Sequence, residues 1–205
     1  PIWKQQAYQK GAPHVVAPSE WMAQEARKSS LFGSASVHVI PNGLDTQVFR
    51  PRPAEGLRSA VGIDPSARVV LFVAQSTSNT RKGFDRLQKV LSELPPQKTD
   101  EEVHLVSVGS NEPEIAGHLS QTHLGAVYGD VLLSVIYSLA DLFVIPSRQD
   151  NLPNTVLESM ACGTPVVGVD TGGIPDMVRS GETGWLATAE SRTALRRALV
   201  QALSD

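Results

Sequence analysis

The sequence predicts an α/β fold in which a Rossmann-like parallel sheet carries helices on both faces. The first observation is a series of short apolar runs, at residues 69–74, 103–108, 142–145 and 165–169. The second is that segments long enough for a crossover helix separate these runs. Strands buried on both faces of a parallel sheet read as continuous apolar runs, and their alternation with helical segments indicates an α/β sheet.

The composition is that of an ordinary globular chain. Of its 205 residues 41% are hydrophobic, and the net charge of -3 gives no reason to expect nucleic acid as a partner. The single cysteine, Cys162, excludes an internal disulfide and fits a reducing compartment. No apolar run approaches the ~20 residues that a membrane-spanning helix needs. We therefore expect a cytoplasmic protein without a transmembrane segment, with peripheral binding to the inner face of the membrane as an alternative for the full-length protein.

The N-terminal stretch predicts small elements that precede the main sheet. These are a helix, a strand, a helix, a strand and a turn, at residues 3–10, 14–17, 20–30, 37–40 and 41–45. Ser19 is a good N-cap for the second helix, because its hydroxyl can accept a backbone N–H of the first turn. The proline-rich residues 49–53 predict a linker, with a loop inside a single domain as the alternative.

Four helices are predicted around the main sheet, at residues 83–94, 112–121, 130–140 and 191–203. A further short helix is expected after the strand at 142–145. Asn154 and Thr155 are suitable N-caps for it, and Gly163 followed by Pro165 supplies the stop.

Two carboxylates bracket the start of this short helix. Asp150 lies in the preceding loop and Glu158 lies one turn inside the helix, with seven residues between them. A carboxylate can accept two neighbouring hydroxyls, and the amides of a helix start can bind a phosphate. The pattern therefore indicates a nucleotide-sugar site. The alternative is that Asp150 only caps the loop and that Glu158 is a solvated helix residue.

A second polar loop follows the strand at 69–74 and ends in two cations, Arg81 and Lys82, at the start of a helix. Cations there oppose the helix dipole unless an anion lies between them. A lysine offers a mobile point charge to a diphosphate, and an arginine offers a planar fork. A solvent-facing basic pair is the alternative.

The stretch 142–168 resembles the acidic-x7-Glu signature of the retaining, GT-B-fold glycosyltransferases of family 4, in a variant similar to transferases of bacterial surface polysaccharides. The resemblance implies that Glu158 binds the ribose hydroxyls of the donor and that Asp150 lies beside the donor sugar. It also places Lys82 on the diphosphate, so Asp150 and Lys82 are the catalytic candidates. The family more often has glutamate where this chain has Asp150, and an arginine near residues 74–75, which Arg81 would have to replace.

The resemblance implies further donor-binding residues, and the residue pattern itself predicts no metal ion. The donor-binding candidates besides Glu158 are Arg81, Gly109, Asn151, Leu152, Asn154 and Thr155. The five histidines lack the spacing of a metal site, and no Asp-x-Asp pair is present. We therefore expect no cofactor other than the nucleoside diphosphate sugar itself. The chain also lacks a G-x-G-x-x-G fingerprint, which argues against a dehydrogenase.

By the same resemblance, residues 1–45 are the tail of an N-terminal, acceptor-side Rossmann-like domain. Residues 46–66 are the linker and domain entry, and residues 67–205 are the donor-binding domain, with its C-terminus truncated. The implied function is transfer of a sugar from a UDP or GDP sugar to a hydroxyl of a saccharide or lipid-linked acceptor. The alternatives are a nucleotide-sugar 2-epimerase of similar fold and a non-catalytic nucleotide-sugar binding module. As half of a two-domain cleft, the chain is expected to bind a nucleoside diphosphate weakly and to transfer no sugar alone.

Overall fold

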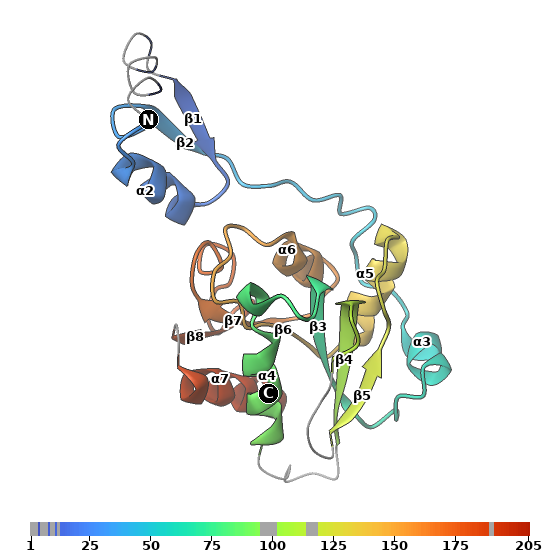
Figure 1. Cartoon of the computed structure of the whole chain (residues 1–205). Coiled ribbons are helices and arrows are strands. Elements are labelled where there is room, and N and C mark those ends of the chain that lie inside the picture. Colours follow the sequence, from blue (N-terminus) through green and yellow to red (C-terminus); the bar gives the residue numbers. More distant parts are fainter. Residues whose placement is uncertain are drawn as a thin grey trace.

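The computed structural model describes residues 4, 8, 11, 13–94, 102–113, 119–188 and 191–205. Within these residues the strands form a two-stranded and a six-stranded sheet (Figure 1). The strands are β1 (His14–Ala17), β2 (Ser36–Val39), β3 (Arg68–Ser76), β4 (Val103–Ser110), β5 (Ser120–His123), β6 (Leu142–Ile145), β7 (Val166–Asp170) and β8 (Gly184–Thr188). The helices are α2 (Glu20–Lys28), α3 (Glu55–Ala60), the short 3-10 helix η1 (Thr80–Lys82), α4 (Phe84–Ser92), α5 (Asp130–Leu139), α6 (Asn154–Ala161) and α7 (Arg192–Ser204).

The larger sheet has the strand order β5-β4-β3-β6-β7-β8, and all its neighbouring strands are parallel. The predicted parallel α/β sheet is therefore confirmed. From β3 the chain moves outward through β4 and β5, and it then returns to the other side of β3 to form β6. The register pairs Val70 with Leu142 and Leu71 with Phe143. This reversal is the topological switch point, beside which open α/β sheets bind their ligands.

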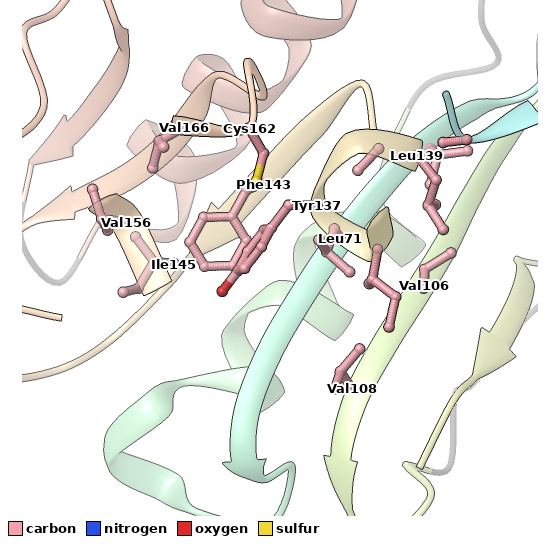
Figure 2. Close-up of a cluster of buried hydrophobic side chains, with 14 of the residues drawn as sticks. Leu71, Val106, Val108, Tyr137, Leu139, Phe143, Ile145, Val156, Cys162 and Val166 are labelled. Atoms are coloured by element: carbon pink, nitrogen blue, oxygen red, sulfur yellow. The ribbon is translucent and has the colours of Figure 1, made fainter. Parts of the chain in front are cut away.

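Helices cover both faces of this sheet because its central strands are apolar on both. Phe143 and Ile145 point to the face covered by α5 and α6, whereas Leu142 and Val144 point to the face covered by α4 and α7. On the first face the rings of Tyr137 and Phe143 meet edge to face, with centroids 5.7 Å apart (Figure 2). All four residues of β6 are buried, so this strand lies in the centre of the core.

The smaller sheet pairs β1 with β2 in parallel, and α2 connects them. Ser19 caps α2 as predicted, with its hydroxyl oxygen accepting the N–H of Met22 at 3.1 Å. An extended segment leads from β2 to the larger sheet (Figure 1). The helix expected at residues 3–10 lies outside the described residues, apart from Lys4 and Tyr8.

The helix predicted at residues 112–121 is wrong at both ends. Residues 112 and 113 are not helical, and residues 120–123 form the edge strand β5; residues 114–118 lie outside the described part of the chain. Side chains support β5: His104 hydrogen bonds Thr122, and Ser107 hydrogen bonds His123, each at 2.9 Å. A polar edge strand of this kind has no apolar run, so the criterion that found the central strands missed it. The edge strand β8 and the short helix α3 were not predicted either.

Gly83 should be more sensitive to substitution than Gly62, although both residues have φ 74°. A Cβ at Gly83 would lie 2.0 Å from the carbonyl oxygen of Pro146, whereas a Cβ at Gly62 would have nothing within 4 Å. Gly62→Ala should lose about 1 kcal/mol of unfolding free energy through backbone strain alone. Gly83→Ala should lose clearly more, because the clash adds to the strain. Urea unfolding of both variants measures the difference, and equal losses would contradict the tight contact.

Candidate functional site

The loops that follow β3 and β6 meet at the switch point of the sheet. The first contains η1 and ends at Gly83, whose left-handed conformation allows it to pack against Pro146 of the second loop. The N–H of Arg148 donates to the carbonyl oxygen of Arg81 at 2.8 Å. The two loops therefore touch backbone to backbone, and their side chains are held at fixed relative positions.

Asp150 lies at this junction with a cation on each carboxylate oxygen. Lys82 Nζ is 2.7 Å from Oδ2, and Arg81 Nη1 is 3.3 Å from Oδ1. Ser147 Oγ adds a hydrogen bond to Oδ2 at 3.3 Å. Asp150 is only 9% exposed, and a buried carboxylate is tolerated when cations and hydrogen bonds compensate it. Of the predicted site residues, the structure thus brings Arg81, Lys82 and Asp150 into direct contact.

The backbone of the Asp150 loop is shaped by a glycine turn after β7. A Cβ on Gly172, which has φ 58°, would lie 1.7 Å from the carbonyl oxygen of Asp150. The N–H of Gly173 donates to that same oxygen at 3.0 Å. Only residues without side chains fit this approach, so the glycine turn determines where Asp150 is presented.

The start of α6 differs from the expectation that Asn154 and Thr155 cap it. Asn154 is the first helical residue, Pro153 is the N-cap, and no side chain caps the first turn. The Asn154 side chain instead accepts a hydrogen bond from Asn42 Nδ2 at 2.8 Å. Thr155 Oγ1 is buried and has no partner among the described residues. The first-turn N–H groups therefore receive no side-chain acceptor and can serve an anion.

Glu158 lies on α6, where it contacts a tyrosine that the sequence did not indicate. Tyr137 of α5 is fully buried, and its hydroxyl donates to Glu158 Oε2 at 2.8 Å. Burial raises the pKa of Glu158; the Tyr137 hydrogen bond opposes this rise, and the charge of Asp130 adds to it. Burial, followed by the charge of Glu158, also raises the pKa of Tyr137 well above its ordinary value. The Oε1 atom of Glu158 has no hydrogen-bond partner among the described residues, so it can accept a hydroxyl of a ligand.

No hydrogen bond or ion pair among the described residues joins the side chain of Asp150 to Gly109, Asn151 or Leu152. Gly109 has φ 148° and packs on the end of β3, since its Cβ would be 2.3 Å from the carbonyl oxygen of Ala74. Its N–H donates to the carbonyl oxygen of Gly125 at 2.9 Å, which joins the end of β4 to the loop after β5. Leu152 is buried, and Asn151 accepts a hydrogen bond from Ser19 at 2.9 Å.

The described ranges contain neither a metal-binding cluster nor a membrane-spanning helix. No group of three or more histidine, cysteine, aspartate or glutamate side chains there is arranged to hold a metal ion. No helix in those ranges is both long and apolar enough to cross a lipid bilayer. A cavity of about 180 Å³ between the starts of α4 and α7 has the basic lining residues Arg86, Lys89, Arg148 and Arg192. Asp85 pairs with Arg148 at 2.6 Å, and this cavity contains none of the predicted site residues.

Comparisons with known proteins show the family of the chain. Residues 67–205 match the model of a family described as Glycosyl transferases group 1. Alpha-maltose-1-phosphate synthase of Mycolicibacterium smegmatis is 32% identical over 200 residues, which are 90% of this chain and 50% of that protein. The chain thus spans about half the length of the curated relatives it matches.

Solved structures share the fold. Sucrose-phosphate synthase of Thermosynechococcus elongatus superimposes with a TM-score of 0.80 at 24% identity, covering 100% of this chain and 52% of that one. Anabaena HepE in complex with UDP and glucose superimposes with a TM-score of 0.74 at 21% identity, covering 100% of this chain and 57% of that one.

The raised pKa of Glu158 predicts a pH-dependent effect of Glu158→Gln on stability. The folded protein holds this proton more tightly than the unfolded chain, whose ordinary value is 4.5. Ionising Glu158 therefore costs stability as the pH rises through the folded-state pKa, whereas glutamine cannot ionise. The melting temperature of Glu158→Gln relative to the wild type should increase between about pH 4 and about pH 8. A difference that stays constant or falls over this range would contradict the burial of the charge.

Proposed function

The chain belongs to the Glycosyl transferases group 1 family, and on that basis we propose that it forms the donor-binding part of a retaining, family 4 glycosyltransferase. The fold matches structures of the GT-B class. In this proposal a sugar passes from a UDP or GDP sugar to a hydroxyl of a saccharide or lipid-linked acceptor, in the synthesis of a bacterial surface polysaccharide or glycolipid. Residues 1–45 belong to the acceptor-side domain, 46–66 to the linker and 67–205 to the donor-binding domain.

The contact of Lys82 with Asp150 at the switch point carries this proposal. A diphosphate needs cations and N–H donors, and Lys82 and the uncapped start of α6 both border the Asp150 loop. As the bond to the sugar breaks, negative charge accumulates on the leaving diphosphate. A cation already held in place stabilises that charge without reorganisation, which lowers the barrier. Lys82 therefore has the role of stabilising the leaving group.

Asp150 has an electrostatic role in this proposal. Both its oxygens face cations, which weaken the carboxylate as a nucleophile and hold it in a fixed position. A fixed negative charge beside the reacting carbon favours a transition state in which the sugar becomes positively charged. Asp150 thus positions the donor sugar and stabilises its oxocarbenium-like transition state.

Glu158 has the role of ribose ligand. Its Oε2 atom is held by Tyr137, which leaves Oε1 to accept from a hydroxyl. A half-buried carboxylate with a raised pKa gains more from new hydroxyl donors than a solvated one does. A ribose offers two neighbouring hydroxyls of this kind.

The charge needed by the diphosphate comes from the protein in this proposal, so no metal ion takes part. Lys82 and Arg81 are the cations at the site. Nucleotide binding should therefore survive EDTA. A solved structure of the same fold contains UDP and glucose, so UDP is the first ligand to test, followed by GDP.

Lys82→Ala should weaken binding of the nucleoside diphosphate far more than binding of the bare nucleoside, because the lost charge acts only on the phosphates. Removing a charged hydrogen-bond partner should cost about ten- to a hundredfold in affinity for UDP or GDP. Lys89→Ala is the matched control, since it removes an exposed lysine from α4. Isothermal titration calorimetry with UDP, GDP and their nucleosides provides the measurement.

Two outcomes of that titration would count against the proposal. The wild type could fail to bind either nucleoside diphosphate, or Lys82→Ala could lose affinity for diphosphate and nucleoside equally. The gap between the two ligands should also shrink as salt is added, since salt screens charge interactions.

Glu158→Gln should abolish the preference of the protein for a nucleoside diphosphate over its 2′-deoxy analogue. The wild type should bind the ribose form about ten- to a hundredfold more tightly, through hydrogen bonds to a charged group. The variant keeps the shape of the side chain but lacks the charge, so the two ligands should bind it almost equally. Calorimetry on the four combinations decides, and an unchanged preference would remove Glu158 from the ribose site.

A further inference from the structure

The start of α2 lies directly against the loop that carries Asp150. Ser19 is 1% exposed and makes two hydrogen bonds through one oxygen. Its Oγ accepts the N–H of Met22 at 3.1 Å and donates its own proton to Asn151 Oδ1 at 2.9 Å. The start of α2 is thus hydrogen-bonded to Asn151, a predicted donor-binding residue that lies 132 positions further along the chain.

A second pair of contacts stabilises this junction. The N–H of Glu20, in the first turn of α2, donates to Asp176 Oδ2 at 2.7 Å. A carboxylate at a helix start is favourable because it faces unsatisfied N–H groups. Gly173 lies between Ser19 and the Asp150 loop. A Cβ at Gly173 would be 1.8 Å from the carbonyl oxygen of Asn151 and 2.8 Å from Ser19 Cβ. The absence of a side chain at Gly173 therefore lets α2 approach the Asp150 loop.

A third contact reaches the other end of the same loop. Asn42, in the segment after β2, donates its Nδ2 to Asn154 Oδ1 at 2.8 Å. Two side chains from the N-terminal part of the chain, Ser19 and Asn42, thus donate hydrogen bonds to amide oxygens, one on Asn151 and one on Asn154. The Ser19 hydroxyl determines the orientation of Asn151, because it already accepts from Met22 and must face an acceptor with its proton.

This arrangement leaves the amide nitrogens of both asparagines for a ligand. A side-chain amide carries two N–H donors on Nδ2. Among the described residues, neither Asn151 Nδ2 nor Asn154 Nδ2 has a hydrogen-bond partner. Asn151 directly follows Asp150, whose partner is Lys82. Two N–H donor groups and a cation therefore border one loop, which suits a ligand that offers only acceptor oxygens.

We propose that Ser19 and Asn42 are positioning residues for the donor diphosphate. By holding the amide oxygens of Asn151 and Asn154, they present the Nδ2 groups of these residues to the diphosphate oxygens. If an amide rotated by half a turn, its oxygen would face the phosphate and repel it. Ser19 and Asn42 thus contribute to donor affinity without touching the donor. This inference rests on the proposed function and extends it to residues outside 67–205.

The test measures UDP and GDP affinity of the full chain by calorimetry. Ser19→Ala should weaken binding of the nucleoside diphosphate about three- to tenfold, the value of one hydrogen bond, and leave binding of the bare nucleoside unchanged. Ser191→Ala is the matched control: Ser191 caps α7 in the same way, accepting from Ala194 N at 3.1 Å, so this variant loses a cap alone. Ser19→Thr keeps a hydroxyl at the cap and should restore the affinity.

Two further variants separate positioning from general stability. Asn42→Ala leaves the α2 cap intact and should also weaken diphosphate binding. In a double-mutant cycle, Ser19→Ala should have no further effect once Asn151→Ala is present, because it acts through Asn151.

Wild-type affinity in Ser19→Ala and Asn42→Ala, or equal losses in Ser19→Ala and Ser191→Ala, would overturn the inference while the proposed function stands. A wild type that binds neither UDP nor GDP would overturn the proposed function and this inference with it.

Discussion

The candidate site depends on the parallel pairing of β3 with β6 in the centre of the larger sheet. Because both strands end at the same edge, the loops after them must share one space, and Gly83 is the residue that lets them do so. That convergence brings Lys82 and Asp150 to 2.7 Å. Neither side chain would be favourable there without the other. The buried carboxylate of Asp150 needs a cation, and a cation such as Lys82 near a helix start needs an anion. The fold therefore creates a charged pair that an anionic ligand can enter.

The two acidic residues differ in how their charge is compensated, and this difference supports the separate roles proposed for them. Asp150 has a cation on each oxygen, so its charge is compensated directly. Glu158 has only the hydroxyl of Tyr137, so burial raises its pKa and its charge is under-solvated. A group of the first kind can stabilise positive charge that develops nearby. A group of the second kind gains from hydroxyl donors, which a ribose supplies. The spacing of seven residues is the same in any sequence with the pattern, but the environments come from different strands and helices.

The central strands and part of the site could be predicted from the sequence. The edge strands and the contacts between helices could not, and the physical reasons are related. The strands β3, β4, β6 and β7 are buried on both faces, so their apolar runs reveal them. The edge strand β5 is polar, and nothing local distinguishes it from a loop or a helix end. The proximity of Lys82 and Asp150 follows from their places after adjacent strands. The contact of Tyr137 with Glu158 depends on how α5 packs on α6, which no local pattern records.

The Ser19 contact depends on how the smaller sheet and α2 dock against the larger sheet. Its sequence signal was that of an ordinary helix cap, and the cap is present. A hydroxyl that accepts from its own helix still has one proton to donate, and the structure directs that proton to Asn151. The same atom therefore satisfies a local requirement of α2 and orients an amide 132 positions away. Since the Gly173 contact allows no side chain, a shift of α2 relative to the larger sheet would alter the Asp150 loop. The position of α2 and the shape of the Asp150 loop therefore depend on each other.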